Sequence, residues 1–185
     1  MFLSRLAKWL DKCSTIDGVG DLVMTVANED PDTRRIHTPG TLEVWLVEDS
    51  EADELLMRAA LKMDGLNCEF HVSEDGEKAI EFIEAIDRGE PRPRPHVVLL
   101  DLNLPRKGGT RVLERIRMSP ECARVPVVIV TSSDSPKDKS QVSRLGATRY
   151  FQKPLDLMEF MKLGPLVREV VSSGNPAAPA ASLPN

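Results

Sequence analysis

Five short apolar runs alternate with amphipathic segments between residues 41 and 172, and this alternation is the strongest constraint on the fold. The runs are LEVWLV (42–47), CEFHV (68–72), HVVLLD (96–101), VPVVIVTS (125–132) and TRYFQK (148–153). The third and fourth contain continuous apolar stretches, VVLL and VVIV, which are typical of strands covered on both faces. Strict alternation of strands with helices favours a parallel sheet with a helical layer on each side. We therefore predict a doubly wound α/β domain over residues 41–172.

The segments between the runs have helical periodicity. In the first of them, apolar residues recur at helical spacing, namely Ala52, Leu55, Leu56, Ala59, Ala60 and Met63. Ser50, followed by Asp53 three residues later, resembles a capping box at the start of this helix. The last helix is predicted to begin near Asp156 and to contain Pro165. Because proline removes a helical hydrogen bond, we predict a kink or interruption near Gly164-Pro165.

Residues 1–40 and 173–185 differ from this pattern. The first segment has apolar residues on one helical face with basic residues beside them, namely Phe2, Leu6, Trp9, Leu10, Arg5, Lys8 and Lys12. It could be a membrane-surface helix, a helix docked on the domain, or sequence upstream of a start at Met24. Residues 27–40 read as a linker, and the Ala-, Ser- and Pro-rich end as a disordered tail.

Composition and charge narrow the class of protein. With 24 basic and 29 acidic residues, the chain has a formal net charge of −5, which argues against nonspecific nucleic-acid binding. No apolar run reaches membrane-spanning length. Cys13, Cys68 and Cys122 form neither a zinc pattern nor a disulfide framework, and the three histidines have no metal-ligand spacing. We therefore expect a cytoplasmic protein.

Polar side chains collect where the predicted strands end. Glu48 and Asp49 follow the first strand, Asp101 ends the third, Thr131 the fourth and Lys153 the fifth. The carboxyl ends of parallel strands share one edge of a sheet, so we expect these five side chains to converge there.

Three clustered carboxylates repel one another unless a cation lies between them. Their oxygen atoms suit Mg²⁺, and Lys153 could pair with an incoming phosphoryl oxygen. Asp101 follows the central strand and is the best-placed nucleophile toward phosphorus. A single acid after a strand is usually a helix cap or a solvated turn residue, but this reading explains the set at four strand ends poorly.

The strings LVEDS, VLLDLNLPRKGG, VTSSD and YFQKP occur in the order found in response-regulator receiver domains, and the chain resembles that family over residues 42–171. EPRPRP before the third strand and LLDLNLP after it resemble the stand-alone regulators paired with bacterial phytochromes. The resemblance implies a flavodoxin-like (βα)5 sheet in strand order 2-1-3-4-5. It also implies a Mg²⁺-dependent phosphorelay in which a histidine kinase, possibly of the phytochrome type, is the partner.

The resemblance also assigns roles by position. Asp101 would be the phosphoacceptor, and Asp49, Asp101 and the backbone carbonyl of Asn103 would bind Mg²⁺, with Glu48 acting through water. Thr131 and Lys153 would hold the phosphoryl oxygens, and Tyr150 would be the aromatic switch residue. The bond Lys153-Pro154 would be cis. In place of the usual Asp-Gly after the third strand, this chain has Gly108-Gly109.

No output domain follows the predicted receiver, so we expect a non-enzymatic switch that acts through a protein partner, a homodimer or onward phosphotransfer. The alternative is a phosphatase or phosphotransferase with an aspartate nucleophile. Such enzymes usually have a second carboxylate two residues after the nucleophile, where this chain has Asn103. A flavin-binding protein would need a hydroxyl- and glycine-rich loop after the first strand, where this chain has the acidic EDSEADE.

Overall fold

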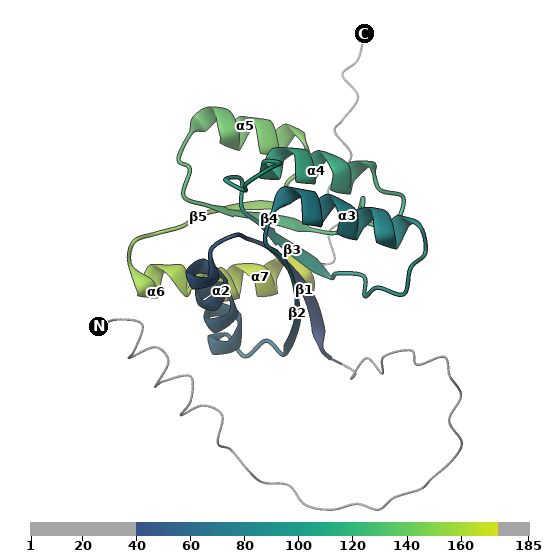
Figure 1. Cartoon of the computed structure of the whole chain (residues 1–185). Helices are drawn as coiled ribbons and strands as arrows, with labels where there is room; N and C mark the ends of the chain where they lie inside the picture. Colours follow the sequence, from purple (N-terminus) through teal and green to yellow (C-terminus); the bar gives the residue numbers. More distant parts are fainter. Residues whose placement is uncertain (1–39, 174–185) are drawn as a thin grey trace, which may run out of the picture. The chain divides into compact units, whose positions relative to one another are not determined.

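A computed structural model of the chain describes residues 40–173, which form a five-stranded parallel sheet between two helical layers (Figure 1). The strands are β1 (Leu42–Val47), β2 (Cys68–Ser73), β3 (Val97–Leu100), β4 (Val127–Thr131) and β5 (Arg149–Gln152). Their order is β2-β1-β3-β4-β5, and all four pairings are parallel. The predicted doubly wound fold and its strand order are therefore confirmed.

Helices cover both faces of the sheet. They are α2 (Glu51–Met63), α3 (Gly76–Asp87), α4 (Gly109–Met118), α5 (Pro136–Arg144), α6 (Leu157–Phe160) and α7 (Leu163–Ser172). In Figure 1, α3, α4 and α5 lie on one side of the sheet, and α2, α6 and α7 on the other. Each face of the sheet has its own hydrophobic core, and successive residues of β1 point alternately into the two. Val44 and Leu46 pack with α2 and α7, whereas Trp45 and Val47 pack with α3 and α4.

The packing face of α2 agrees with the predicted one in part, because Ala59 and Ala60 are buried and Leu56 packs against the core. Met57 and Leu61 are fully buried with Ala60, while Leu55 is 44% exposed and Met63 50% exposed. Helix α2 makes a close crossing with α7, in which a Cβ on Gly164 would lie 2.4 Å from the carbonyl oxygen of Ala60. Ala60 and Gly164 are both small, which allows this close approach.

The predicted interruption of the last helix is confirmed, but it lies a few residues before the Gly164-Pro165 pair. Helix α6 ends at Phe160, and α7 begins at Leu163. Pro165 lies in the first turn of α7, where its missing N–H needs no partner. Its ring excludes the carbonyl four residues earlier, that of Met161, which explains a break at this point.

Helix α5 lies in the same layer as α3 and α4, but it is weakly anchored to the domain. Of the described residues of α5, only Val142 is buried.

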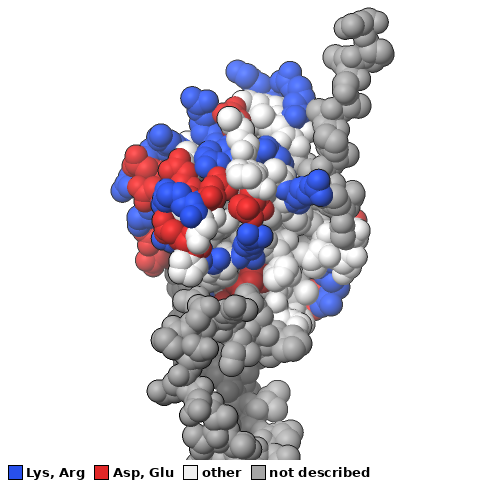
Figure 2. Space-filling model, turned by 90° about the vertical axis from the view of Figure 1, so that its right-hand side faces the viewer, with Lys and Arg blue, Asp and Glu red and all other residues white. Residues whose placement is uncertain are grey.

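On the face drawn in Figure 2, Lys and Arg side chains lie among Asp and Glu side chains, so neither sign of charge dominates this face. Within residues 40–173, no helix is long and apolar enough to cross a membrane.

His71, His96 and the two described cysteines have structural surroundings. The Nε2 atom of His71 lies 2.6 Å from a carboxylate oxygen of Glu43, and the backbone N–H of Glu43 donates to Nδ1 of His96. Cys68 packs against the core, and burial raises the pKa of its thiol to about 11. Cys122 is buried.

Several sequence predictions lie outside residues 40–173. They concern the amphipathic segment, the linker before Gly40, Cys13, His37 and the tail. The domain boundaries at residues 40 and 172 remain predictions.

The glycine pair at the start of α4 yields a test of the loop that follows β3. A Cβ on Gly109 would lie 2.0 Å from the carbonyl oxygen of Asp101, whereas the nearest atom to a Cβ on Gly108 is the Leu102 oxygen at 3.6 Å. Gly109→Ala is therefore expected to lower the free energy of unfolding by about 1–3 kcal/mol in urea titrations.

Gly108→Ser is the matched control. It places a favourable N-cap residue at a position without a side-chain cap, so stability should hold or rise by a few tenths of a kcal/mol. Equal destabilisation by both substitutions would contradict the close approach of Gly109.

Candidate functional site

Three carboxylates meet at the carboxyl edge of the sheet. Glu48 and Asp49 directly follow β1, and Asp101 directly follows β3, its neighbour in the sheet. One oxygen from each of the three lies within 4.8 Å of the other two. Glu48 and Asp101 are buried, with 2% and 4% exposure, while Asp49 is exposed. The structure thus brings together the three acids that the sequence pattern selected.

Lys153 directly follows the edge strand β5 and reaches this cluster along the carboxyl edge of the sheet. Its backbone N–H donates to the carbonyl of Thr131, which aligns the residue after β5 with the end of β4. Its Nζ atom lies 2.8 Å from Glu48, 2.8 Å from Asp101 and 2.7 Å from Asp53. Burial alone would lower the pKa of Lys153, but hydrogen bonds to the three carboxylates outweigh burial and raise it. The ammonium therefore stays charged.

Glu48 is the most enclosed of the acids. One carboxylate oxygen accepts from the backbone N–H of Ser50 at 3.2 Å, and the other faces Lys153. Burial raises the pKa of Glu48 above its ordinary value, although Lys153 opposes this shift. A further positive charge near Glu48, such as a metal cation, would therefore stabilise the charged form of its carboxylate.

Asp53 is a site residue that sequence reasoning assigned only to a helix cap. Its backbone N–H donates to the Ser50 hydroxyl at 3.3 Å, so half of the predicted capping box forms. The reciprocal bond is absent because the Ser50 N–H donates to Glu48 and the Asp53 carboxylate reaches Lys153. The available sequence signal was an acid in the first helical turn beside this edge of the sheet.

Asn103 lies in the loop after β3, and Thr131 is the last residue of β4 at the same edge of the sheet. The backbone N–H of Asn103 donates to Oδ1 of Asp101 at 3.0 Å, which fixes that carboxylate between Asn103 and Lys153. The side-chain amide of Asn103 lies 3.4 Å from the hydroxyl of Thr131 and 3.3 Å from that of Ser132. Thr131 is fully buried. The expectation that the carbonyl of Asn103 binds metal remains a prediction.

Tyr150 on β5 contacts the loop after β4. Its hydroxyl donates to the carbonyl of Ser133 at 2.6 Å, and the N–H of Ser133 lies 3.4 Å from the Thr131 hydroxyl. Burial raises the pKa of Tyr150. Ser133 therefore joins Thr131 to Tyr150 through its backbone, a link that a sequence pattern does not reveal.

The expected cis bond between Lys153 and Pro154 is wrong for this structure. No cis peptide bond occurs in residues 40–173. Bonds before proline favour trans by about 0.5–1 kcal/mol, and Lys153 reaches all three carboxylates with the trans form.

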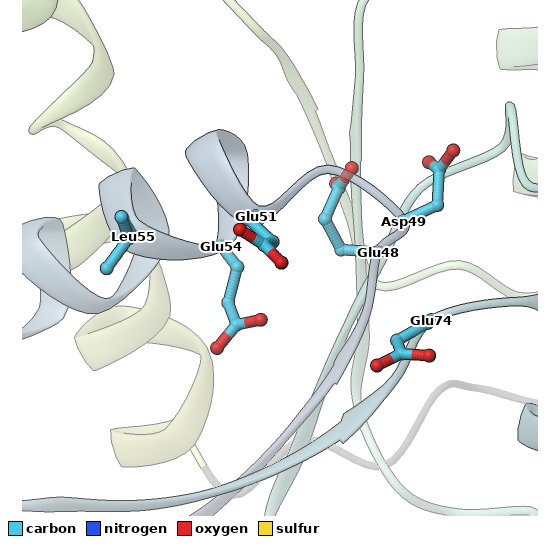
Figure 3. A pocket seen from close by; sticks show the side chains of 6 residues that line it. All are labelled: Glu48, Asp49, Glu51, Glu54, Leu55 and Glu74. Carbon is cyan, nitrogen blue, oxygen red and sulfur yellow. The ribbon is translucent and has the colours of Figure 1, made fainter. Parts of the chain in front are cut away.

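An acidic pocket of about 440 Å³ opens beside the cluster (Figure 3). Its lining comes from the loop after β1, the first turn of α2 and the loop after β2, namely Glu48, Asp49, Glu51, Glu54, Leu55 and Glu74. In Figure 3, the carboxylates of Glu54 and Glu74 face each other across a gap, those of Glu48 and Asp49 point away from them, and Leu55 lies farther along α2.

The donor set fits a hard divalent cation. Carboxylate oxygens are the ligands that Mg²⁺ prefers, and an open side leaves room for the water molecules that this ion retains. Within residues 40–173, Glu48, Asp49 and Asp101 form the one group of acidic, His or Cys side chains close enough to share an ion. Lys153 supplies a single charge against three carboxylates of this group and Asp53, so negative charge remains in excess.

Comparison with known proteins agrees with this geometry. The family model of the response regulator receiver domain matches residues 44–163. The chain is 37% identical over 120 residues to response regulator Rcp1 of Synechocystis sp., covering 65% of this chain and 82% of that one.

Two solved structures are similar in fold and sequence. The phosphorylated cyanobacterial phytochrome response regulator RcpA matches with a TM-score of 0.64 and 30% identity, over 75% of this chain and 99% of its own. The Mn²⁺-bound form of Rcp1 matches with a TM-score of 0.63 and 31% identity, over 78% and 99% of the two chains.

Removing the ammonium tests the electrostatics of the cluster. Lys153→Ala leaves buried Glu48 and Asp101 without their cation, so the free energy of unfolding in chelator should fall by about 1–3 kcal/mol. Saturating Mg²⁺ should restore most of this loss. Urea titrations with chelator and with Mg²⁺ measure both effects.

The same variant should respond to pH. Burial raises the pKa of Glu48 and Lys153 opposes this shift, so removing Lys153 should raise the pKa further. As the pH falls, the folded variant then takes up a proton at a higher pH than the folded wild type does, and the carboxylate repulsion in the variant is relieved. The deficit of Lys153→Ala relative to wild type should therefore shrink between neutral pH and about pH 5. A deficit that grows on acidification would contradict repulsion between carboxylates as its cause.

Proposed function

Because this chain belongs to the response regulator receiver family, we propose that it is a phosphorylation switch whose Asp101 accepts a phosphoryl group from a histidine kinase. The observation that carries the proposal is the position of Asp101. Its carboxylate follows the central strand and lies between the Asn103 N–H and the Lys153 ammonium, beside Glu48 and Asp49.

In the proposed reaction, a carboxylate oxygen of Asp101 attacks the phosphorus of a phosphohistidine. A P–O bond forms as the P–N bond breaks, the imidazole leaves with the bonding electron pair, and the product is an acyl phosphate on Asp101. Such transfers depend mainly on positioning and charge neutralisation. The Asn103 N–H would orient the nucleophile, while Lys153 and Thr131 would donate to phosphoryl oxygens, and their contacts at this edge of the sheet support these roles.

Mg²⁺ is the proposed cofactor, and it would neutralise charge on the transferring group. Asp49, Asp101 and the carbonyl of Asn103 would hold it directly, with Glu48 acting through water. The convergence of three carboxylates supports this assignment, as does the Mn²⁺-bound form of the similar regulator Rcp1.

The signal would leave the site through the loop after β4. A phosphoryl group that draws the Thr131 hydroxyl would disturb its contact with the Ser133 N–H, and the Ser133 carbonyl is the acceptor of Tyr150. Tyr150 would then change its position on β5. We propose this chain of contacts as the switch.

The output would be protein contact rather than catalysis. Asn103 occupies the position where an aspartate-nucleophile phosphatase would carry its second carboxylate, and an amide cannot act there as a general acid. The similarity to cyanobacterial phytochrome regulators supports a phytochrome-type kinase as the partner, acting in the cytoplasm. The downstream partner could be another protein or a second copy of this chain.

Substituting the nucleophile tests the proposed function. Asp101→Asn keeps the shape of the side chain but removes the attacking oxygen and one charge of the metal group. Mass spectrometry after treatment with acetyl phosphate and Mg²⁺ should find one labile phosphoryl group on the wild type and none on the variant. Chelator should abolish labelling of the wild type. Labelling that resists chelator, or that persists on Asp101→Asn, would refute the mechanism.

Truncation tests whether the receiver unit suffices. Glu48, Asp49, Asp101, Thr131 and Lys153 all lie after residue 40. A chain that begins at Thr41 should therefore be labelled by acetyl phosphate at a rate close to that of the full chain. A folded truncated chain that is not labelled would show that the first 40 residues complete the site.

A further inference from the structure

The ammonium of Lys153 has no spare hydrogen-bond donor in this structure. A lysine ammonium has three N–H bonds, and Nζ of Lys153 lies 2.7–2.8 Å from three carboxylates. The Lys153 side chain is 9% exposed, so water has little access to the ammonium. Any new partner of Lys153, including a phosphoryl oxygen, must therefore replace one of these carboxylates.

The three carboxylates on Lys153 are not equivalent. Glu48 and Asp101 belong to the group that could share a metal ion, and Asp53 does not. Asp53 comes from the first turn of α2, and its side chain is 31% exposed. The Ser50 N–H, which a capping box would offer to the Asp53 carboxylate, donates to Glu48 instead, and the carboxylate pairs with Lys153. Asp53 is thus the partner that Lys153 can keep when a cation occupies the cluster.

We infer that Asp53 is a positioning residue, which holds the ammonium of Lys153 in the site while Glu48 and Asp101 turn to the metal ion. The inference rests on the proposed function and deepens it. Without Asp53, the ammonium keeps only Glu48 and Asp101 as partners and competes with the cation for both. Asp53 therefore favours metal binding without being a ligand.

Isothermal titration with Mg²⁺ alone tests this role on the full chain. Asp53→Asn should weaken Mg²⁺ binding roughly threefold to tenfold, the range expected when a partly exposed ion pair is lost. Glu51→Gln is the matched control, because Glu51 lies in the same turn, lines the same pocket and carries the same charge. It should change the affinity less than about twofold. Equal effects of the two substitutions would overturn the inference.

A double-mutant cycle shows whether Asp53 acts through Lys153. In a Lys153→Met background, Asp53→Asn should affect Mg²⁺ affinity no more than Glu51→Gln does. An undiminished effect would mean that Asp53 acts on the metal directly, and it would overturn the positioning role. Asp53→Ser, which a first helical turn accepts, replaces Asp53→Asn in the same cycle if that variant misfolds.

Phosphorylation kinetics separate this inference from the proposed function. Asp53→Asn should react slowly with acetyl phosphate at limiting Mg²⁺ and approach the wild-type rate at saturating Mg²⁺. A rate defect that saturating Mg²⁺ does not relieve would count against the inference. If wild type is not labelled on Asp101 at all, the proposed function fails. If wild type is labelled and Asp53→Asn behaves as Glu51→Gln does, only the role of Asp53 fails.

Discussion

The structure of the site depends on one ammonium group held among three carboxylates. Lys153 follows β5 at one edge of the sheet, yet its partners come from the ends of β1 and β3 and from α2. Two of these partners are buried acids that would otherwise repel each other in a region of low dielectric constant. The lysine allows them to remain charged and close together, so a site suited to a cation exists before any cation arrives.

Much of this arrangement was predictable from the sequence, because it follows from topology. Apolar strands with polar residues at their ends are enough to place Glu48, Asp49, Asp101 and Lys153 along one edge of a parallel sheet. The glycine at the start of α4 also has a clear cause, since a side chain there would collide with the carbonyl of Asp101.

Other features were beyond a linear pattern because each depends on contacts between elements. Asp53 was predicted as half of a capping box, but its carboxylate pairs with Lys153, which lies 100 residues away in sequence. The close crossing of α2 with α7 depends on the contact between Ala60 and Gly164, which the helical spacing of α2 does not reveal. The geometry of the bond before Pro154 depends on the path of the loop, and a motif alone did not decide it.

The two helical layers differ in how firmly their helices pack on the sheet. Helix α2 packs closely against α7 where Gly164 meets Ala60, and its residue Asp53 is a partner of Lys153. On the opposite layer, Val142 is the single described residue of α5 that is buried, and the loop leading into this helix is the one that Thr131 and Tyr150 both contact. Local opening costs least where few apolar side chains are buried. Of the two helical layers, we therefore expect the one that contains α5 to yield more readily when the contacts at the site change.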